Sequence, residues 1–106
     1  MVVVDLDPVR GSEQGKIRPA VIIQNDDGNE HSPITIVAPI ISKVYTKVYP
    51  TNVFLSSTES GLSKDSTILL NQIRTIDKTR ISKKIGSLPL EIMRNVDEAI
   101  RSSLDV

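Results

Sequence analysis

The stretch Ile34-Thr-Ile-Val-Ala-Pro-Ile-Ile41 decides the fold class of this chain. Its residues are mostly β-branched, and such side chains pack well on the pleated surface of a strand. Pro39 lies inside the run and cannot donate a hydrogen bond to a ladder, so it marks an edge strand or a bulge. The stretch therefore predicts a β-strand that lies at an edge or is irregular near residue 39.

Further short strands are expected on both sides of this run, and an amphipathic helix follows them. From Pro89 onward, apolar residues recur every three or four positions up to Leu104, which is typical of one face of a helix. The intervening segment 56–66 is rich in Ser and Thr and is expected to be a loop or a single helical turn. The other segments with strand-type composition are 2–6, 17–24, 52–55, 67–70 and 73–76. We expect a mainly β protein with a C-terminal helix, built as a small antiparallel barrel or curled sheet that the helix plugs or flanks.

Length and composition narrow the possible functions. The 106 residues suit a single domain, 1–106. With no cysteine and one histidine, the chain offers no disulfide, no thiolate nucleophile, no Cys-based zinc site and no histidine pair. Thirteen Lys and Arg balance thirteen Asp and Glu, so net charge does not indicate a bulk nucleic-acid binder. No apolar run approaches the ~20 residues of a membrane span. We expect a soluble, cytoplasmic protein without metal or cofactor.

The most unusual segment, Asp7-Pro-Val-Arg-Gly-Ser-Glu-Gln-Gly-Lys-Ile-Arg-Pro19, joins the first two strands. It exceeds the usual hairpin loop of about two to five residues, and long loops often carry binding residues. A long mobile hairpin is the alternative. Arg18 precedes Pro19, which favours extended backbone, so a rigid strand can present its planar guanidinium to a phosphate. The alternative is an edge-strand arginine that lies over apolar surface.

Two further groups of residues suggest nucleic-acid contacts. Tyr45 and Tyr49 share a polar loop with Lys43 and Lys47, a mixture that can stack bases and hold a single-stranded backbone. These tyrosines could equally cover the edge of the core. A local excess of cations is formed by Arg74, Lys78, Arg80, Lys83 and Lys84. It would form a phosphate-binding face if it lay beside Arg18, and is otherwise a solvated turn.

His31 follows a turn and is expected to be an exposed loop residue rather than a catalytic base.

Several stretches, in order along nearly the whole chain, resemble the MazF/PemK family of toxin ribonucleases. The most specific are Gly11-Ser-Glu-Gln-Gly15 followed by Arg18-Pro19, and Gln72-Ile-Arg-Thr-Ile-Asp-Lys78. The resemblance implies a small SH3-like β-barrel, a homodimer, and an endoribonuclease toxin of a type II toxin–antitoxin system. Such a toxin cleaves single-stranded mRNA at specific sequences without a metal. The resemblance also implies an acidic antitoxin that covers the RNA groove and links the toxin to DNA.

The resemblance further assigns roles to individual residues. The family's key arginine precedes proline after the glycine-rich loop, which makes Arg18 the expected catalytic cation. It would assist attack by the RNA 2′-hydroxyl, giving a 2′,3′-cyclic phosphate and a 5′-hydroxyl. Asn71 stands where relatives often carry an acid, and Asn52 where a histidine can appear. With Lys43 and Tyr49 from the polar loop, the expected RNA-binding residues are Ser12, Glu13, Gln14, Lys43, Tyr49, Pro50, Asn52, Asn71 and Gln72.

One position departs from the family pattern. A threonine at the end of the third strand is a second key residue, and the gap-free match here is Ile41. The next residue, Ser42, becomes the expected catalytic hydroxyl if a bulge at Pro39 re-aims the strand. Met1 also falls inside the family's first strand, which indicates a short first strand or a truncated chain. Two other functions remain open: a DNA gyrase poison with the same fold, and a catalytically weakened RNA-binding member.

Overall fold

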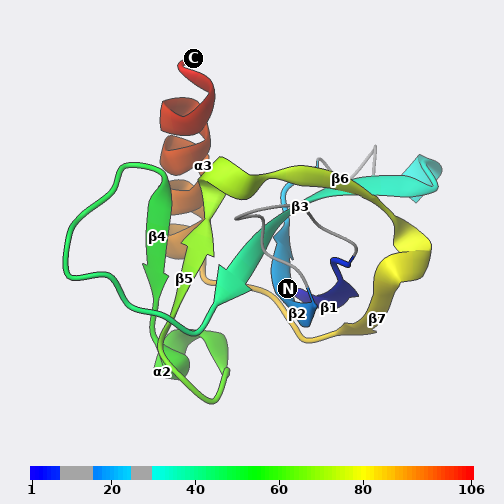
Figure 1. Cartoon of the computed structure of the whole chain (residues 1–106), viewed down its shortest axis with the longest axis horizontal. Helices are drawn as coiled ribbons and strands as arrows, with labels where there is room; N and C mark the ends of the chain where they lie inside the picture. The colour runs from blue at the N-terminus through cyan, green and yellow to red at the C-terminus, as the bar shows by residue number, and fades with distance from the viewer. Residues whose placement is uncertain (8–15, 25–29) are drawn as a thin grey trace.

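The computed structural model describes residues 1–7, 16–24 and 30–106 (Figure 1). Every strand pairing among them is antiparallel. A fifteen-residue helix, α3, follows the last strand. The elements are β1 (Val2–Asp5), β2 (Ile17–Ile22), β3 (Ile34–Ile41), β4 (Asn52–Leu55), α2 (Ser57–Ser60), β5 (Ser66–Leu69), η1 (Leu70–Gln72), β6 (Arg74–Asp77), η2 (Lys78–Arg80), β7 (Ile81–Lys84) and α3 (Leu90–Leu104). The predicted mainly β fold with a C-terminal helix is confirmed, as is the helical turn expected within 56–66.

Strand β3 is the centre of the sheet. The described strands follow the order β4-β5-β3-β2-β1-β7, and β6 also pairs with β3. On one side β3 pairs with β2, and on the other it pairs first with β6 and then with β5. In Figure 1, β6, η2 and β7 run around from β3 towards β1, which curls this half of the sheet.

Pro39 lies neither on an edge strand nor at a bulge, although the pairing of β3 is interrupted on one side of it. Pro39 pairs with Ala20 in a regular register, inside the sheet. On the other side of β3, the ladder with β6 ends at Val37 and the ladder with β5 begins at Ile40. A residue without an N–H is tolerated there because it lies in the gap between these two ladders.

Of the expected barrel or curled sheet, the structure shows an open, curled sheet, so the SH3-like barrel that the resemblance implies is corrected. Strand β7 was not predicted, and it pairs with β1, whereas β6 pairs with β3. These two strands are joined by η2, and in the described part of the chain no ladder connects them. Asp77 caps η2 by accepting a hydrogen bond from the Thr79 N–H at 2.9 Å, which lowers the pKa of this carboxyl.

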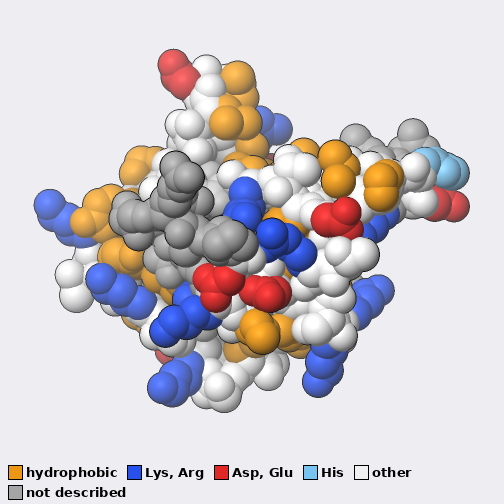
Figure 2. Space-filling view, turned by 45° about the vertical axis from the view of Figure 1, so that its right-hand side comes forward, with side chains coloured by type: hydrophobic (Ala, Val, Ile, Leu, Met, Phe, Trp, Pro, Cys, Tyr) orange, Lys and Arg blue, Asp and Glu red, His pale blue; other side chains and the backbone are white. Residues whose placement is uncertain are grey.

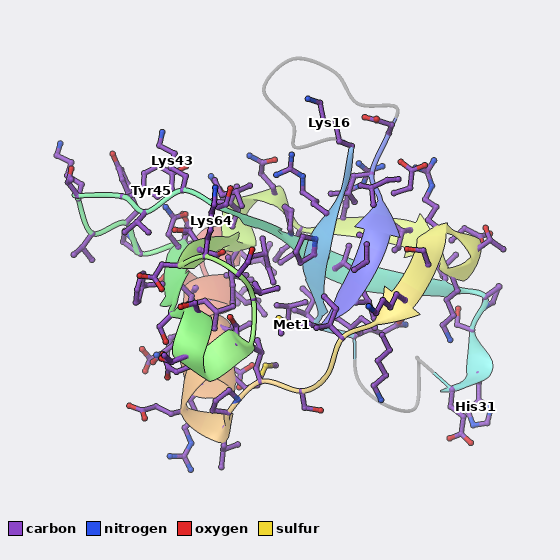
Figure 3. The ribbon with its side chains drawn as sticks, turned by 90° about the horizontal axis from the view of Figure 1, so that it is seen from below. Met1, Lys16, His31, Lys43, Tyr45 and Lys64 are labelled. Atoms are coloured by element: carbon purple, nitrogen blue, oxygen red, sulfur yellow. The ribbon has the colours of Figure 1, made fainter. Side chains whose placement is uncertain are left out.

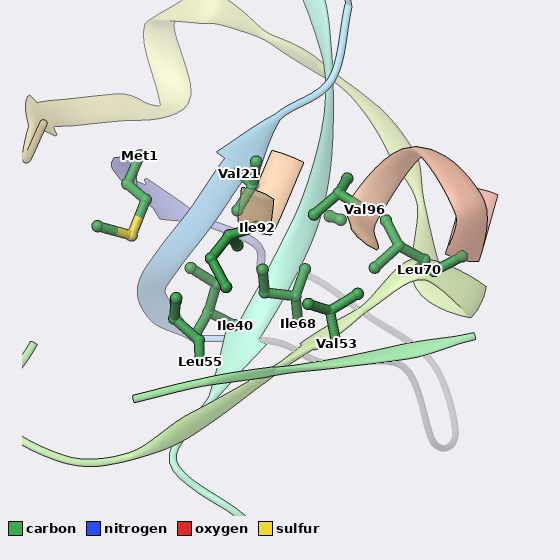
Figure 4. Packing of buried hydrophobic residues seen from close by; sticks show 11 residues of the cluster. Met1, Val21, Ile40, Val53, Leu55, Ile68, Leu70, Ile92 and Val96 are labelled. Atoms are coloured by element: carbon green, nitrogen blue, oxygen red, sulfur yellow. The ribbon is translucent and has the colours of Figure 1, made fainter. Parts of the chain in front are cut away.

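Both faces of the sheet carry buried apolar residues. The larger cluster lies between one face and α3, where Ile92, Val96 and Ala99 are buried against strand residues such as Ile40 and Ile68 (Figure 4). The second cluster lies on the opposite face and is formed by Val4, Leu6, Ala20, Val37 and Ile76. Helix α3 packs against β4 and η1, so it flanks the sheet rather than plugging it. No helix in the described ranges is long and apolar enough to cross a membrane.

Candidate functional site

The face of the sheet that points away from α3 carries a row of four side chains. Paired residues share a face, and Ile41 pairs with Thr67, which in turn pairs with Phe54. Ile40, Ile68 and Val53 alternate with them and belong to the cluster under α3. Continuing the β2–β3 register for two residues past Ala20 and Pro39 places Arg18 opposite Ile41. The row therefore runs from Arg18 through Ile41 and Thr67 to Phe54.

Arg18 and Ser42, the two expected catalytic residues, line one pocket of about 410 Å³. The pocket lies where β2 begins and β3 ends, so residues of both sheet faces reach it. Arg18 is half-buried and Ser42 is exposed. This places a planar cation and a hydroxyl around one space, which is suited to binding a phosphate.

Ser42 reaches this pocket without the bulge that the sequence analysis required. Strand β3 ends at Ile41, so Ser42 follows the ladder rather than alternating within it. Ile41 itself is apolar and only 8% exposed, on the face shared with Arg18. The structure thus separates the two candidate positions: residue 41 is buried, and residue 42 is accessible.

Two lysines of the same pocket were missed as site residues. Lys16 and Lys64 line it with Arg18, and Figure 3 shows both on the same side of the molecule. The backbone at Lys16 is held by a hydrogen bond from its N–H to Asp7 Oδ1 at 2.8 Å, and it has a left-handed φ of 64°. Lys64 follows α2, where Asp65 accepts a hydrogen bond from the Ser57 N–H at 2.8 Å. In the sequence their only signal was positive charge.

Four of the expected RNA-binding residues come together in a second pocket, of about 170 Å³. They are Tyr49, Asn52, Asn71 and Gln72, joined there by Tyr45, Thr51 and Leu69. Backbone hydrogen bonds fix this pocket, since the Leu70 N–H donates to the Thr51 carbonyl at 2.9 Å. The amide side chains offer both donors and acceptors, which is what recognition of a base edge needs.

An aromatic pair forms one wall of this amide pocket. The ring centroids of Tyr45 and Tyr49 lie 5.6 Å apart at an interplanar angle of 79°. The ammonium group of Lys43, another expected RNA-binding residue, lies 4.8 Å from the centroid of the Tyr45 ring. Pro50 instead lines a groove on the α3 side of β4, beside Val48 and Asn95. Tyr45 was noted in the sequence as a stacking residue but not included among the expected site residues.

His31 lies outside both pockets, and three expected RNA-binding residues are not among those that the structure describes. Ser12, Glu13 and Gln14 lie outside the described residues. His31 is exposed as predicted, with its Nε2 3.8 Å from the Glu30 carboxylate, and lies far from Lys43 and Tyr45 (Figure 3).

The basic residues between Arg74 and Lys84 are spread over β6, η2 and β7. Arg74 lies on the sheet face of Arg18, because it pairs with Val37 and Val37 pairs with Ile22. Arg74 Nη1 donates to the Leu6 carbonyl at 2.9 Å, and Arg80 Nη1 donates to the Asp5 carbonyl at 3.2 Å. These two arginines therefore hold the end of β1. Strand β1 separates β7 from β2. Figure 2 shows Asp and Glu side chains interspersed with Lys and Arg side chains on one face of the molecule.

The chain is similar to known proteins in both sequence and fold. A family model described as "PemK-like, MazF-like toxin of type II toxin-antitoxin system" matches residues 1–104. The chain is 51% identical over 100 residues to "Endoribonuclease EndoA" of Bacillus subtilis (strain 168), which covers 94% of this chain and 86% of that protein. The solved "Mycobacterium tuberculosis toxin MazF-mt6" is similar with a TM-score of 0.83 and 25% identity, covering 99% of this chain and 95% of that one. MazF from Deinococcus radiodurans is similar with a TM-score of 0.81 and 25% identity, covering 99% and 92%.

Proposed function

Because the chain belongs to the PemK-like, MazF-like toxin family of type II toxin–antitoxin systems, we propose that this endoribonuclease cleaves single-stranded mRNA at specific sequences without a metal ion. The observation that carries the proposal is the shared pocket of Arg18 and Ser42. A cation and a hydroxyl suffice for this chemistry, because RNA supplies its own nucleophile next to each phosphate.

In the proposed reaction, the 2′-hydroxyl oxygen attacks the adjacent phosphorus and the bond from phosphorus to the 5′-oxygen breaks. The 2′-hydroxyl gives its proton to solvent water and the leaving 5′-oxygen takes one from solvent, giving a 2′,3′-cyclic phosphate and a 5′-hydroxyl. Negative charge grows on the phosphate oxygens in the transition state, and the Arg18 guanidinium stabilises it. Ser42 donates a hydrogen bond to the same group and orients it. Lys16 and Lys64 raise the local positive potential that attracts the backbone.

Sequence selection is assigned to the amide pocket. Asn52, Asn71 and Gln72 would read base edges there by hydrogen bonds, with Tyr49 beside them. Ser12, Glu13, Gln14 and Pro50 remain proposed contacts for the flanking nucleotides. Asn71 is uncharged, so it can both donate to and accept from a base, unlike an acid at the same position.

The family description supports an antitoxin as the regulatory partner. We propose a homodimer in the cytoplasm, with an acidic antitoxin segment bound across it and DNA contacted only through that antitoxin. The cationic pocket of Arg18, Lys16 and Lys64 would attract carboxylates as it attracts phosphates. RNA and antitoxin would then compete for one surface.

A single experiment tests the activity. Purified protein is incubated with a long single-stranded RNA in EDTA, and the product ends are analysed. Discrete fragments with cyclic phosphate ends are expected. Cleavage that stops in EDTA would contradict the metal-independent reaction. Intact RNA that still binds would indicate a catalytically weakened member. The family match does not favour gyrase poisoning.

A further inference from the structure

The loop between β3 and β4 holds an aromatic pair at the amide pocket, and both ends of the loop are tied down. At its start, the buried Thr67 hydroxyl donates to the Lys43 carbonyl at 2.5 Å. At its end, the Asn52 N–H donates to the Tyr49 carbonyl at 3.0 Å. The rings of Tyr45 and Tyr49 are therefore carried by a backbone that is anchored to β5 and β4.

These rings are not part of the hydrophobic core. Neither tyrosine belongs to the apolar cluster under α3 or to the cluster on the opposite face. Tyr49 is 44% exposed, and both line the pocket that contains Asn52, Asn71 and Gln72. Both rings thus line the amide pocket, and they also line a space with Val44, Val48 and Phe54.

We propose that Tyr45 is a specificity-determining residue, whose ring stacks on one base of the RNA while the amides of the pocket contact that base's edge. The inference deepens the proposed ribonuclease function and depends on it. Single-stranded nucleic acid needs an aromatic surface for its bases and a cation for its phosphates. Tyr45 supplies the first, and Lys43, whose ammonium lies 4.8 Å from the ring centroid, supplies the second.

The position of this ring relative to the reacting phosphate also fits. Arg18 lies on β2, and Thr67, which anchors the loop, lies on β5 in the same row of the same face. Two strand spacings, about 10 Å, separate the two backbones. A base stacked on Tyr45 and a phosphate at Arg18 can therefore belong to one short stretch of RNA. Because stacking strength differs between purines and pyrimidines, the ring would set a preference at one position.

The composition of the chain provides a direct probe. Tyr45 and Tyr49 are its two tyrosines, and it has no tryptophan. Intrinsic tyrosine fluorescence therefore reports on the amide pocket alone. A single-stranded RNA whose reacting 2′-hydroxyl is replaced by hydrogen binds without being cleaved. We expect its binding to quench this fluorescence, in step with the anisotropy change of a label on the RNA.

Variants at residue 45 then test the role of the ring. Tyr45→Phe keeps the ring and should keep KM, whereas Tyr45→Leu should raise KM about tenfold with little change in kcat. Tyr45→Leu should also reduce the purine–pyrimidine preference at one position of the cleavage site. Leu104→Ala is the control, because it removes an exposed apolar side chain from α3, outside the amide pocket and the pocket of Arg18.

The outcomes separate this inference from the proposed function. Two outcomes would overturn the role of Tyr45 and leave the ribonuclease function intact. One is labelled RNA that binds and is cleaved without tyrosine quenching. The other is a folded Tyr45→Leu protein with the parental KM and base preference. RNA that neither binds nor is cleaved by the parental protein would overturn both.

Discussion

Arg18→Ala should remove most RNA cleavage while leaving the fold intact. Arg18 is the second residue of β2, where it pairs with Val4 and precedes Pro19. It lines the pocket with Ser42. Removing one preorganised donor from developing charge typically costs about 10²–10³ in rate. Lys16 and Lys64 remain in the pocket and keep part of the positive potential, so we expect a loss near 10². Arg18→Lys keeps the charge but loses the planar fork of donors, so its cleavage rate should lie between those of the parental protein and Arg18→Ala.

The assay is single-turnover cleavage of a labelled RNA in EDTA, with saturating protein so that binding does not limit the rate. Arg94→Ala is the matched control, because it removes an exposed arginine from α3, outside the pocket of Arg18 and Ser42. Circular dichroism and the urea midpoint verify that each variant is folded. A folded Arg18→Ala protein that cleaves at close to the parental rate would refute the assignment of Arg18.

Three further outcomes are expected. Ser42→Ala should lower kcat about tenfold or more. Ile41→Thr should raise kcat, because it adds a hydroxyl on the sheet face of Arg18. If both variants cleave at the parental rate, the end of β3 is not part of the site. Asp77→Asn should destabilise the fold at neutral pH but not in acid. The native hydrogen bond to Thr79 lowers the pKa of Asp77, so its stabilisation is lost as pH falls through that value, and urea midpoints across pH would measure this. A cognate antitoxin should displace uncleavable RNA from the protein. The affinity of the antitoxin should weaken but persist as salt rises. A titration that forms a ternary complex of protein, RNA and antitoxin would contradict the shared surface.

The parts of the fold with strong periodicity could be predicted from the sequence. The β-branched run of β3 and the apolar spacing of α3 produce their elements because burial on one face follows from that spacing. Strand β7 lacks such a signal, since only Ile81 of its four residues is apolar, and it forms because it pairs with β1. The place of Pro39 inside the sheet depends on β3 changing partners there, which is a long-range property that local propensity does not contain.

The candidate site was predictable to the extent that chemistry follows from residue type. Arg18 was identified from its neighbour Pro19 and its family motif, and Tyr49, Asn52, Asn71 and Gln72 do lie in one pocket. Lys16 and Lys64 could not be found in this way, because an ordinary surface lysine carries the same local signal. Their proximity to Arg18 arises only when α2 and the start of β2 meet beside the end of β3.

The strand pairing shows which hydroxyl groups lie near Arg18. Ile41 shares the face of Arg18 but has no polar atom, and its partner across the ladder is Thr67. The Thr67 hydroxyl is buried and donates a hydrogen bond to the Lys43 carbonyl, so it holds the loop that carries Tyr45 and is closed off from a phosphate. Ser42 is exposed and lines the same pocket as Arg18. We therefore expect separate roles for the two hydroxyls: Ser42 would contact a phosphate held at Arg18, and Thr67 would hold the loop that carries Tyr45.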